Sequence, residues 1–151
     1  MFRGLSKVTL DAKGRLAIPS RYREKIIARS EGKLVTTVNR DLSLLIYPLP
    51  EWDELERKLM RLPTLHAETE RLQSLLLGHA TDVEMDNQGR VLLSRELREF
   101  AGLEQKAMLV GRGNRFALWD EQRWIERRTE WLESESSDFK DLPAELMSLS
   151  I

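Results

Sequence analysis

A motif written twice constrains this chain more than any other feature. Residues 11–15 read DAKGR, and residues 86–90, 75 positions later, read DNQGR. The first copy continues with LAIPSRYRE and the second with VLLSRELRE, so the match includes an apolar triplet, a polar break and a final Arg-Glu pair. A fixed offset over this length indicates two structural repeats, each too small to bury a core alone. The two repeats are therefore expected to share one barrel-like core.

Around each motif the sequence predicts a strand, a tight turn and a second strand. Val8 and Leu10 alternate with polar residues, which is the period of a half-buried strand. Asp11 and Gly14 supply turn chemistry, because Asp bonds its own downstream backbone and Gly accepts a positive φ. The other expected strands are 33–38, 42–48, 82–86, 90–93, 106–111 and 115–120, and the expected helices are 20–30, 52–60, 66–78, 95–103 and 121–133.

Apolar residues recur on one face of each expected helix. Ser94 is a predicted helix N-cap, and Gly32 and Gly78 are placed where helices end. The apolar faces are Tyr22, Ile26 and Ile27, then Trp52, Leu55, Leu59 and Met60, then Leu72, Leu75 and Leu76, and last Trp124, Ile125, Trp131 and Leu132.

The expected organisation follows the repeat. Residues 1–50 form the first repeat and residues 51–79 form connecting helices. Residues 80–124 form the second repeat, and residues 125–151 form a C-terminal helix and an acidic, frayed tail. The fold class is α+β.

The net charge of −1 hides a dipolar chain. Residues 1–31 carry eight Lys or Arg against three acids, whereas residues 120–151 carry four against nine. A basic end suits a polyanion, and oppositely charged ends equally suit the joining of subunits. There is no cysteine, and no apolar run is long enough to span a bilayer, so a cytoplasmic protein without a membrane partner is expected.

The two DxxGR copies allow two interpretations. Asp11 and Arg15 face each other across a turn, as do Asp86 and Arg90, and each pair can simply pin its hairpin. Alternatively, the carboxylate orients the guanidinium for a phosphate or for guanine O6 and N7. Repetition and the basic neighbours leave both interpretations equally open for the first copy. Charges balance over 86–100, which favours a structural role for the second copy.

No other pattern points to an active site. His66 and His79 lie thirteen positions apart without a cysteine partner, so no metal site is expected. GRGNR at 111–115 lacks the spacing of a phosphate loop and predicts a hairpin turn. No catalytic triad stands out, and we expect no enzyme, no cofactor and no small-molecule substrate.

The motifs together resemble the MraZ family of bacterial proteins, which consist of two AbrB-like (SpoVT-AbrB) repeats. The resemblance runs from Met1 to about Trp131. It rests on the segments MFRG, LDAKGRLAIPSRYRE, YPLPEW, LQSLLLGHA, MDNQGRVLL and MLVGRGNRFALWD.

The resemblance implies swapped hairpins that interlock into one pseudo-twofold β-barrel flanked by short helices. It also implies a nucleoid-associated transcription regulator, expected to be a repressor, of the division and cell-wall gene cluster. Such a protein binds short G-rich direct repeats of double-stranded DNA in its own promoter as a ring-shaped homo-oligomer. The candidate DNA-binding residues are Arg3, Lys7, Lys13, Arg15, Arg21 and Arg90, with Asp11, Gly14, Asp86 and Gly89 shaping the two turns.

Two other classes remain open. In one, the chain is a ring-forming interaction protein whose hairpins bind a partner protein. In the other, it is an enzyme that uses surface carboxylates.

Overall fold

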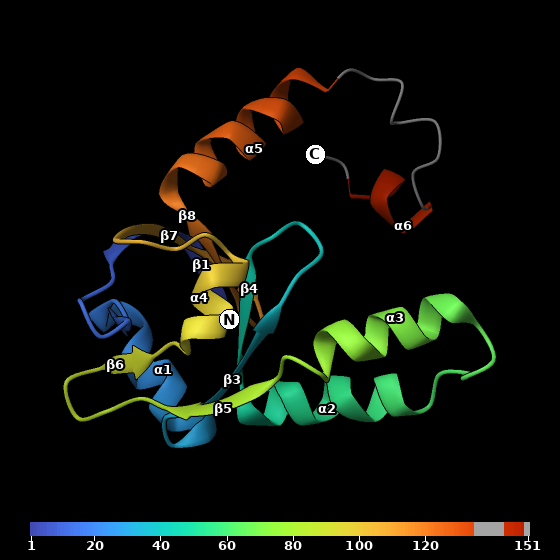
Figure 1. The fold of residues 1–151 in the computed structure, drawn as a ribbon, viewed down its shortest axis with the longest axis horizontal. Helices are drawn as coiled ribbons and strands as arrows, with labels where there is room; N and C mark the ends of the chain where they lie inside the picture. The colour runs from blue at the N-terminus through green and yellow to red at the C-terminus, as the bar shows by residue number, and fades with distance from the viewer. Residues whose placement is uncertain (135–143, 150–151) are drawn as a thin grey trace. The chain divides into compact units, whose positions relative to one another are not determined.

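The computed structural model describes residues 1–134 and 144–149 of the chain. The predicted acidic tail falls mostly on 135–143 and 150–151, outside the described residues. The strands are β1 (Phe2–Thr9), β2 (Arg15–Ala17), β3 (Lys33–Val38), β4 (Leu44–Pro48), β5 (Thr81–Glu84), β6 (Arg90–Leu92), β7 (Lys106–Gly113) and β8 (Phe116–Asp120). The helices are α1 (Ser20–Ser30), α2 (Leu49–Met60), α3 (Ala67–Leu76), α4 (Arg95–Phe100), α5 (Glu121–Glu133) and α6 (Ala144–Met147), and Figure 1 labels them in place.

The chain divides into two compact units, Met1–Glu121 and Gln122–Ile151. The first unit contains all eight strands and helices α1 to α4. In the second unit, the rings of Trp124 and Trp131 meet edge to face at 5.8 Å, as the helical spacing predicts. Ile125 and Leu132, expected beside them, are 39% and 80% exposed.

The six-stranded sheet has the order β1-β7-β8-β4-β3-β5, and neighbouring strands are antiparallel. Strands β1, β3 and β4 of the first repeat correspond to β5, β7 and β8 of the second. If each strand is replaced by its counterpart, the same order is obtained in reverse, so the sheet is symmetric in the two repeats. Strand β1 of the first repeat pairs with β7 of the second, and β5 of the second pairs with β3 of the first. Each repeat therefore completes the sheet of the other, and the expected α+β class with repeat-swapped strands is confirmed.

A second, two-stranded ladder joins the motifs themselves. Strand β2 pairs with β6 in antiparallel register, with Leu16 opposite Val91 at its centre. Both residues are fully buried in the core that this ladder shares with the six-stranded sheet. The fold therefore places the two DxxGR turns at opposite ends of one short ladder.

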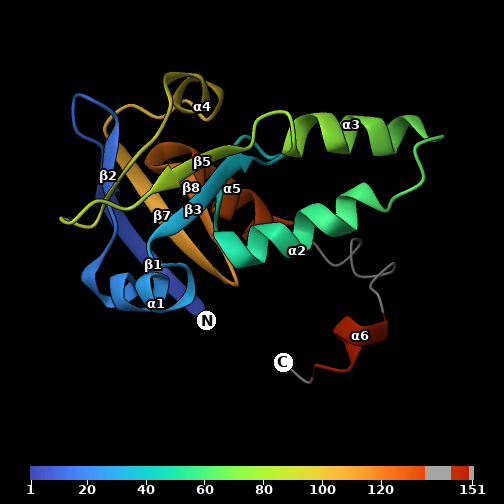
Figure 2. The ribbon, with the colours of Figure 1, turned by 90° about the horizontal axis from the view of Figure 1, so that it is seen from below.

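Helices α1 and α4, one from each repeat, lie beside the strands (Figure 2). Both helices add apolar residues to this core. In α1, Tyr22 contacts both Phe2 and Phe116 through ring centroids 5.9 and 5.0 Å apart. In α4, the predicted cap is confirmed, since Ser94 Oγ accepts the N–H of Leu97 at 3.2 Å.

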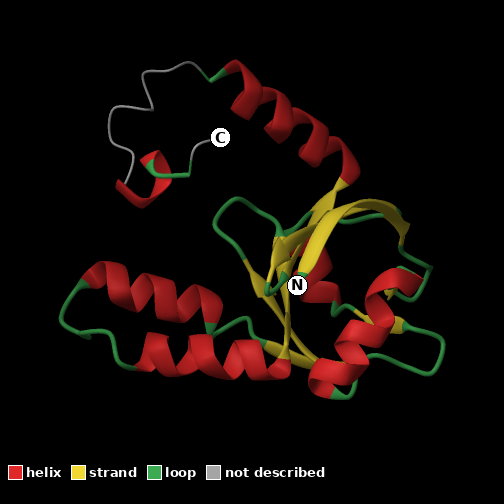
Figure 3. Ribbon diagram, turned by 180° about the vertical axis from the view of Figure 1, so that it is seen from behind, coloured by secondary structure: helices red, strands yellow, loops and turns green. Residues whose placement is uncertain are grey.

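Some residues expected on buried helix faces lie at the surface. Ile27 is 55% exposed although Ile26 is fully buried, because successive helical residues are rotated by about 100°. Met60 is 65% exposed at the end of α2, where the helix has passed the sheet. Helix α3 has no fully buried residue and lies antiparallel to α2 in a hairpin that extends from the strands (Figures 1 and 3).

Within 1–134 and 144–149, no helix is long and apolar enough to cross a membrane.

Candidate nucleic-acid interface

The first DxxGR turn is organised by the carboxylate of Asp11. Its Oδ1 accepts the backbone N–H groups of Lys13 at 3.0 Å and Arg15 at 2.8 Å, and its Oδ2 accepts Nε of Arg15 at 2.6 Å. The predicted pairing across the turn is therefore confirmed. One side chain fixes the turn and also orients the guanidinium that follows it.

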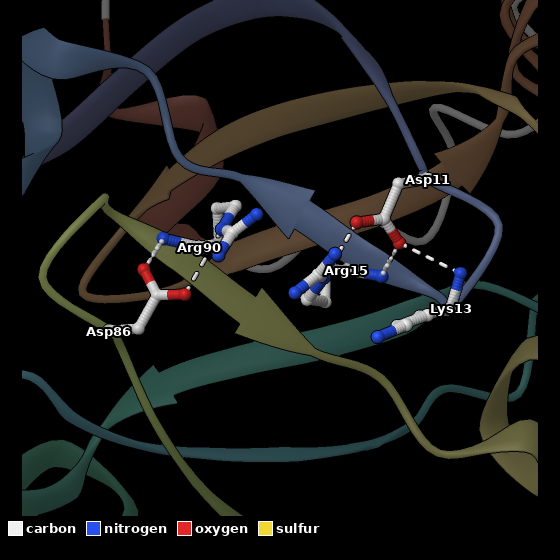
Figure 4. Close-up of polar contacts among 5 residues, drawn as sticks. All are labelled: Asp11, Lys13, Arg15, Asp86 and Arg90. Carbon is white, nitrogen blue, oxygen red and sulfur yellow. Dashed lines mark hydrogen bonds and ion pairs between the residues drawn. The ribbon is translucent and has the colours of Figure 1, made fainter.

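The second turn repeats this geometry. Asp86 Oδ1 accepts the N–H groups of Gln88 at 2.9 Å and Arg90 at 2.8 Å, and Oδ2 accepts Nε of Arg90 at 3.0 Å. Figure 4 shows the two ion pairs on neighbouring strands. The second copy thus forms the same local structure as the first.

Each turn requires its glycine. Gly14 has φ 87° and Gly89 has φ 76°, a region that L side chains rarely adopt. The N–H of Gly14 donates to the carbonyl of Asp11 at 3.0 Å, and that of Gly89 donates to Asp86 at 3.0 Å. The assignment of both glycines as turn residues is therefore confirmed.

These hydrogen bonds lower the pKa of both carboxyl groups. The largest cause at Asp11 is the backbone N–H of Arg15, and at Asp86 it is the backbone N–H of Arg90. Bonds to the ionised form keep each carboxylate charged well below neutral pH. Each therefore remains a negative partner for its arginine under physiological conditions.

Both arginines point away from the core on the same face of the ladder. In β2 and in β6 the middle residue is buried, while the first residue, Arg15 or Arg90, is partly exposed. Arg15 lies opposite Leu92, and Arg90 lies opposite Ala17. Within the described part of the chain, the side-chain hydrogen bonds of Arg15 and Arg90 are made through Nε, to Asp11 and Asp86. The ladder thus presents two oriented guanidinium groups to solvent.

Two further arginines hold these turns, and the sequence did not single them out as site residues. A Cβ added to Gly14 would lie 2.5 Å from Nε of Arg98, and a Cβ added to Gly89 would collide with Arg23. Arg23 Nε donates to the carbonyl of Ile18 at 2.7 Å. Each arginine covers the turn of the other repeat. The signal that could have revealed them is the final Arg-Glu pair, repeated at the same offset of 75.

The other four predicted DNA-binding residues lie on three different elements. Lys13 is exposed on the first turn, next to the oriented guanidinium. Arg21 instead donates through Nη2 to Ser6 Oγ at 2.6 Å on β1. Arg3 and Lys7 are exposed on β1, on the strand face opposite the buried Val8. The six predicted DNA-binding residues therefore do not form one cluster.

The two repeats differ in charge at equivalent positions. Lys7, Lys13 and Arg21 of the first repeat correspond, at an offset of 75, to Asp82, Gln88 and Glu96. Three cations of the first repeat, of which Lys13 lies on its turn, thus have no cationic counterpart in the second, although the two turns have the same geometry.

A metal site and a phosphate-binding loop are the other site types considered from the sequence. No group of three His, Cys, Asp or Glu side chains there could hold a metal ion. GRGNR at 111–115 is the predicted hairpin turn between β7 and β8.

Comparison with known proteins also finds two repeats in the chain. A family model described as "MraZ protein, putative antitoxin-like" matches residues 1–75 and again 76–144.

Full-length relatives agree with this match. "Transcriptional regulator MraZ" of Thioalkalivibrio sulfidiphilus is 50% identical over 151 residues, and those of Halorhodospira halophila and Coxiella burnetii are 49% identical over 152 residues. In all three cases the alignment covers 100% of both chains. Because these relatives are named as regulators, an enzyme is not expected. The chain belongs to the MraZ family.

Proposed function

We propose that this protein is a DNA-binding transcription regulator that reads DNA with the outer face of the β2–β6 ladder. The observation that carries the proposal is the pair of oriented, outward guanidinium groups of Arg15 and Arg90, each fixed by a carboxylate. A guanidinium held in this way can donate two parallel hydrogen bonds to O6 and N7 of guanine. The name of the relatives, transcriptional regulator, supports the same function.

The spacing of the two arginines suits bases that are two steps apart in a duplex. Arg15 and Arg90 are diagonal neighbours on the ladder, for which side chains start about 7–8 Å apart. Two base steps of a duplex rise by about 7 Å. We therefore propose that both hairpins contact DNA within one short G-rich site. Lys13 contacts a neighbouring phosphate and contributes affinity without sequence information.

One ladder makes few base contacts, so an oligomer is needed for tight binding. We propose a ring-shaped homo-oligomer that presents identical ladders to direct repeats about one helical turn, ~10 bp, apart. Direct repeats suit head-to-tail assembly better than palindromes do. The basic N-terminal and acidic C-terminal regions of neighbouring subunits are complementary and can contribute to this assembly. Dissociation of the ring in high salt would support that contribution, and an unchanged mass would count against it.

The finer biological role follows the family resemblance. We propose that the two sheets close into one pseudo-twofold barrel. We also propose that the protein acts in the cytoplasm, on the nucleoid, as a repressor of the division and cell-wall gene cluster that contains its own promoter.

The test is a fluorescence-anisotropy titration of the full chain with a duplex of G-rich direct repeats and a scrambled duplex, at two salt concentrations. Arg15→Ala and Arg90→Ala should each lower affinity for the repeat duplex by about 5- to 150-fold, because each removes a bidentate base contact of about 1–3 kcal/mol. Gel filtration with light scattering should show an unchanged oligomer for both variants.

Two outcomes would contradict the proposal. Equal, weak binding of wild type to both duplexes would favour hairpins that bind a protein partner. Loss of assembly together with DNA binding would make the ion pairs structural.

A further inference from the structure

Three arginines form a row on the outer face of the six-stranded sheet, two on the neighbouring strands β1 and β7 and one in the turn before β8. Arg3 of β1 is the register partner of Arg112 of β7. The N–H of Arg112 donates to the carbonyl of Arg115 at 2.8 Å, where the chain turns into β8. The guanidinium carbon of Arg115 lies 5.9 Å from the ring centroid of Tyr47 on β4. Arg3, Arg112, Arg115 and Tyr47 are called the arginine row below.

The row lies apart from the hairpin face. Phe2, Phe116 and Ile46, each next in sequence to a member of the row, are buried in the core that the β2–β6 ladder covers. Side chains alternate between the two faces of a strand, so the members of the row point away from this core.

Folding alone does not account for the row. Like charges directly opposite each other on neighbouring strands are destabilising. Among the residues that the structure describes, none of the three arginines forms an ion pair. Each acid that lines the hollow beside Arg115 pairs with another cation. Glu51 pairs with Arg29 at 2.8 Å, and Glu54 pairs at 3.5 Å with Lys58, which also lines the hollow.

The hollow beside Arg115 has unused hydrogen-bonding capacity. Its volume is about 290 Å³, and Arg115 and Tyr47 both line it. Arg115 Nη1 donates to Asn114 Oδ1 at 3.0 Å, whereas Nε is buried without a partner in the described structure. Buried donors in proteins are nearly always paired. Burial raises the pKa of the Tyr47 hydroxyl, so it stays protonated near neutral pH.

We propose that the arginine row binds a phosphate group. Neighbouring cross-strand side chains start about 4.5–5.5 Å apart, so adjacent guanidinium groups can converge on one anion. Their planar forks match the oxygens of phosphate, and a bound dianion removes the repulsion along the row. The phosphate comes either from solution or from a nucleic-acid backbone, and both sources share this chemistry.

The first experiment titrates the full chain with inorganic phosphate at constant ionic strength, balanced by chloride. The readouts are the NMR signal of the Arg115 Nε–H group and the thermal unfolding midpoint. Wild type should show saturable binding, and Arg112→Gln should bind phosphate about tenfold more weakly or worse, since one charge-assisted contact is lost. Arg40→Gln is the matched control, because it removes the same charge from the exposed, corresponding turn of the first repeat.

Stability without phosphate supplies a second criterion. Arg112→Gln should melt at the same temperature as wild type or higher, because it removes a repulsive charge from the row. A lower melting temperature would make the row structural and overturn the proposal. An equal response to chloride, or phosphate binding by Arg112→Gln equal to that of wild type, would overturn it as well.

Duplex DNA then separates the two sources of phosphate. For a backbone phosphate, Arg112→Gln lowers the slope of log K against log salt by about 0.9, equally for specific and scrambled duplexes. For a phosphate from solution, DNA affinity does not change. Arg15→Ala removes the proposed base reader and should leave the phosphate titration unchanged, so failure of DNA reading and failure of this site are distinguishable.

Discussion

The side chain of Arg98 lies against the main chain of Gly14, the turn glycine of the other repeat. Arg98 Nε donates to the carbonyl of Leu93 at 3.2 Å, and the N–H of Leu93 donates to the carbonyl of Gly14 at 3.0 Å. Arg23 covers Gly89 in the same way. Each proposed reading hairpin is thus supported by a helix of the opposite repeat, and a change in one repeat should alter the hairpin of the other.

Gly14→Ala should destabilise the protein and weaken DNA binding. The residue has φ 87°, where an L side chain costs about 1–2 kcal/mol, and its Cβ would displace Arg98. Urea unfolding and DNA anisotropy measure the two effects.

Gly113→Ala is the control for this variant, because Gly113 has φ 82° but only Met1 Cε nearby, at 3.8 Å. It should show the backbone cost and no loss of DNA affinity. Equal DNA affinity of the two variants would mean that Arg98 does not support the turn.

Arg98→Ala should cost about 0.5–1.5 kcal/mol of unfolding free energy, since Leu93 loses a hydrogen-bond donor. Combined with Gly14→Ala, the change should be smaller than the sum of the single changes, because the collision disappears with the arginine. A double-mutant cycle in urea measures this coupling. Additive free energies would indicate that the two residues act independently.

The ion pairs should make stability depend on acidic pH. The pKa values of Asp11 and Asp86 in the folded protein lie below the ordinary value of 3.8, so the unfolded chain takes up protons first as pH falls. Their contribution is complete above pH 3.8 and is lost as pH falls through the lowered pKa values.

The double variant Asp11→Asn/Asp86→Asn keeps an oxygen acceptor in each turn and removes the titrating charge. Its unfolding free energy should therefore fall less steeply below pH 3.8 than that of wild type, with parallel curves between pH 5 and 8. Urea unfolding of both proteins from below pH 3.8 to pH 8 is the measurement. If their curves of unfolding free energy against pH are parallel over the whole range, the two carboxylates do not contribute to the pH dependence of stability.

Leu16→Ala should destabilise the protein by about 2–5 kcal/mol, because Leu16 is fully buried where the two repeats meet. Leu92→Ala, on the outer face of the same ladder and 55% exposed, should change stability by at most about 0.5 kcal/mol. Chemical denaturation of both variants tests this difference. Similar losses would mean that the ladder is covered on both faces.

The local structure of the site could be predicted from the sequence because its interactions span only five residues. Asp11, Gly14 and Arg15 lie within one turn, so turn chemistry and hairpin geometry suffice to place them. The repeated offset predicted the second turn equally well. The exchange of strands between the repeats could be predicted only from the family resemblance. Alternation of apolar and polar residues indicates that a strand forms, but it does not specify which strand it pairs with.

Contacts between the repeats could not be predicted in this way. Arg98 and Gly14 are 84 positions apart, and no local pattern links them. Sequence proximity and shared charge group Arg3 and Lys7 with Arg15, whereas strand alternation directs them to another face. Charge composition alone does not specify the face on which a cation lies.

The exchange of strands also sets the order of events during synthesis. Strand β1 leaves the ribosome well before its partner β7, which begins about 100 residues later at Lys106. The apolar strand faces of the first repeat therefore stay uncovered until the second repeat has been synthesised. Pairings this distant in sequence form slowly, and a waiting half can capture the second half of a neighbouring nascent chain. The same interlocking that joins the repeats in the folded protein makes exchange between nascent chains the characteristic folding error of this fold.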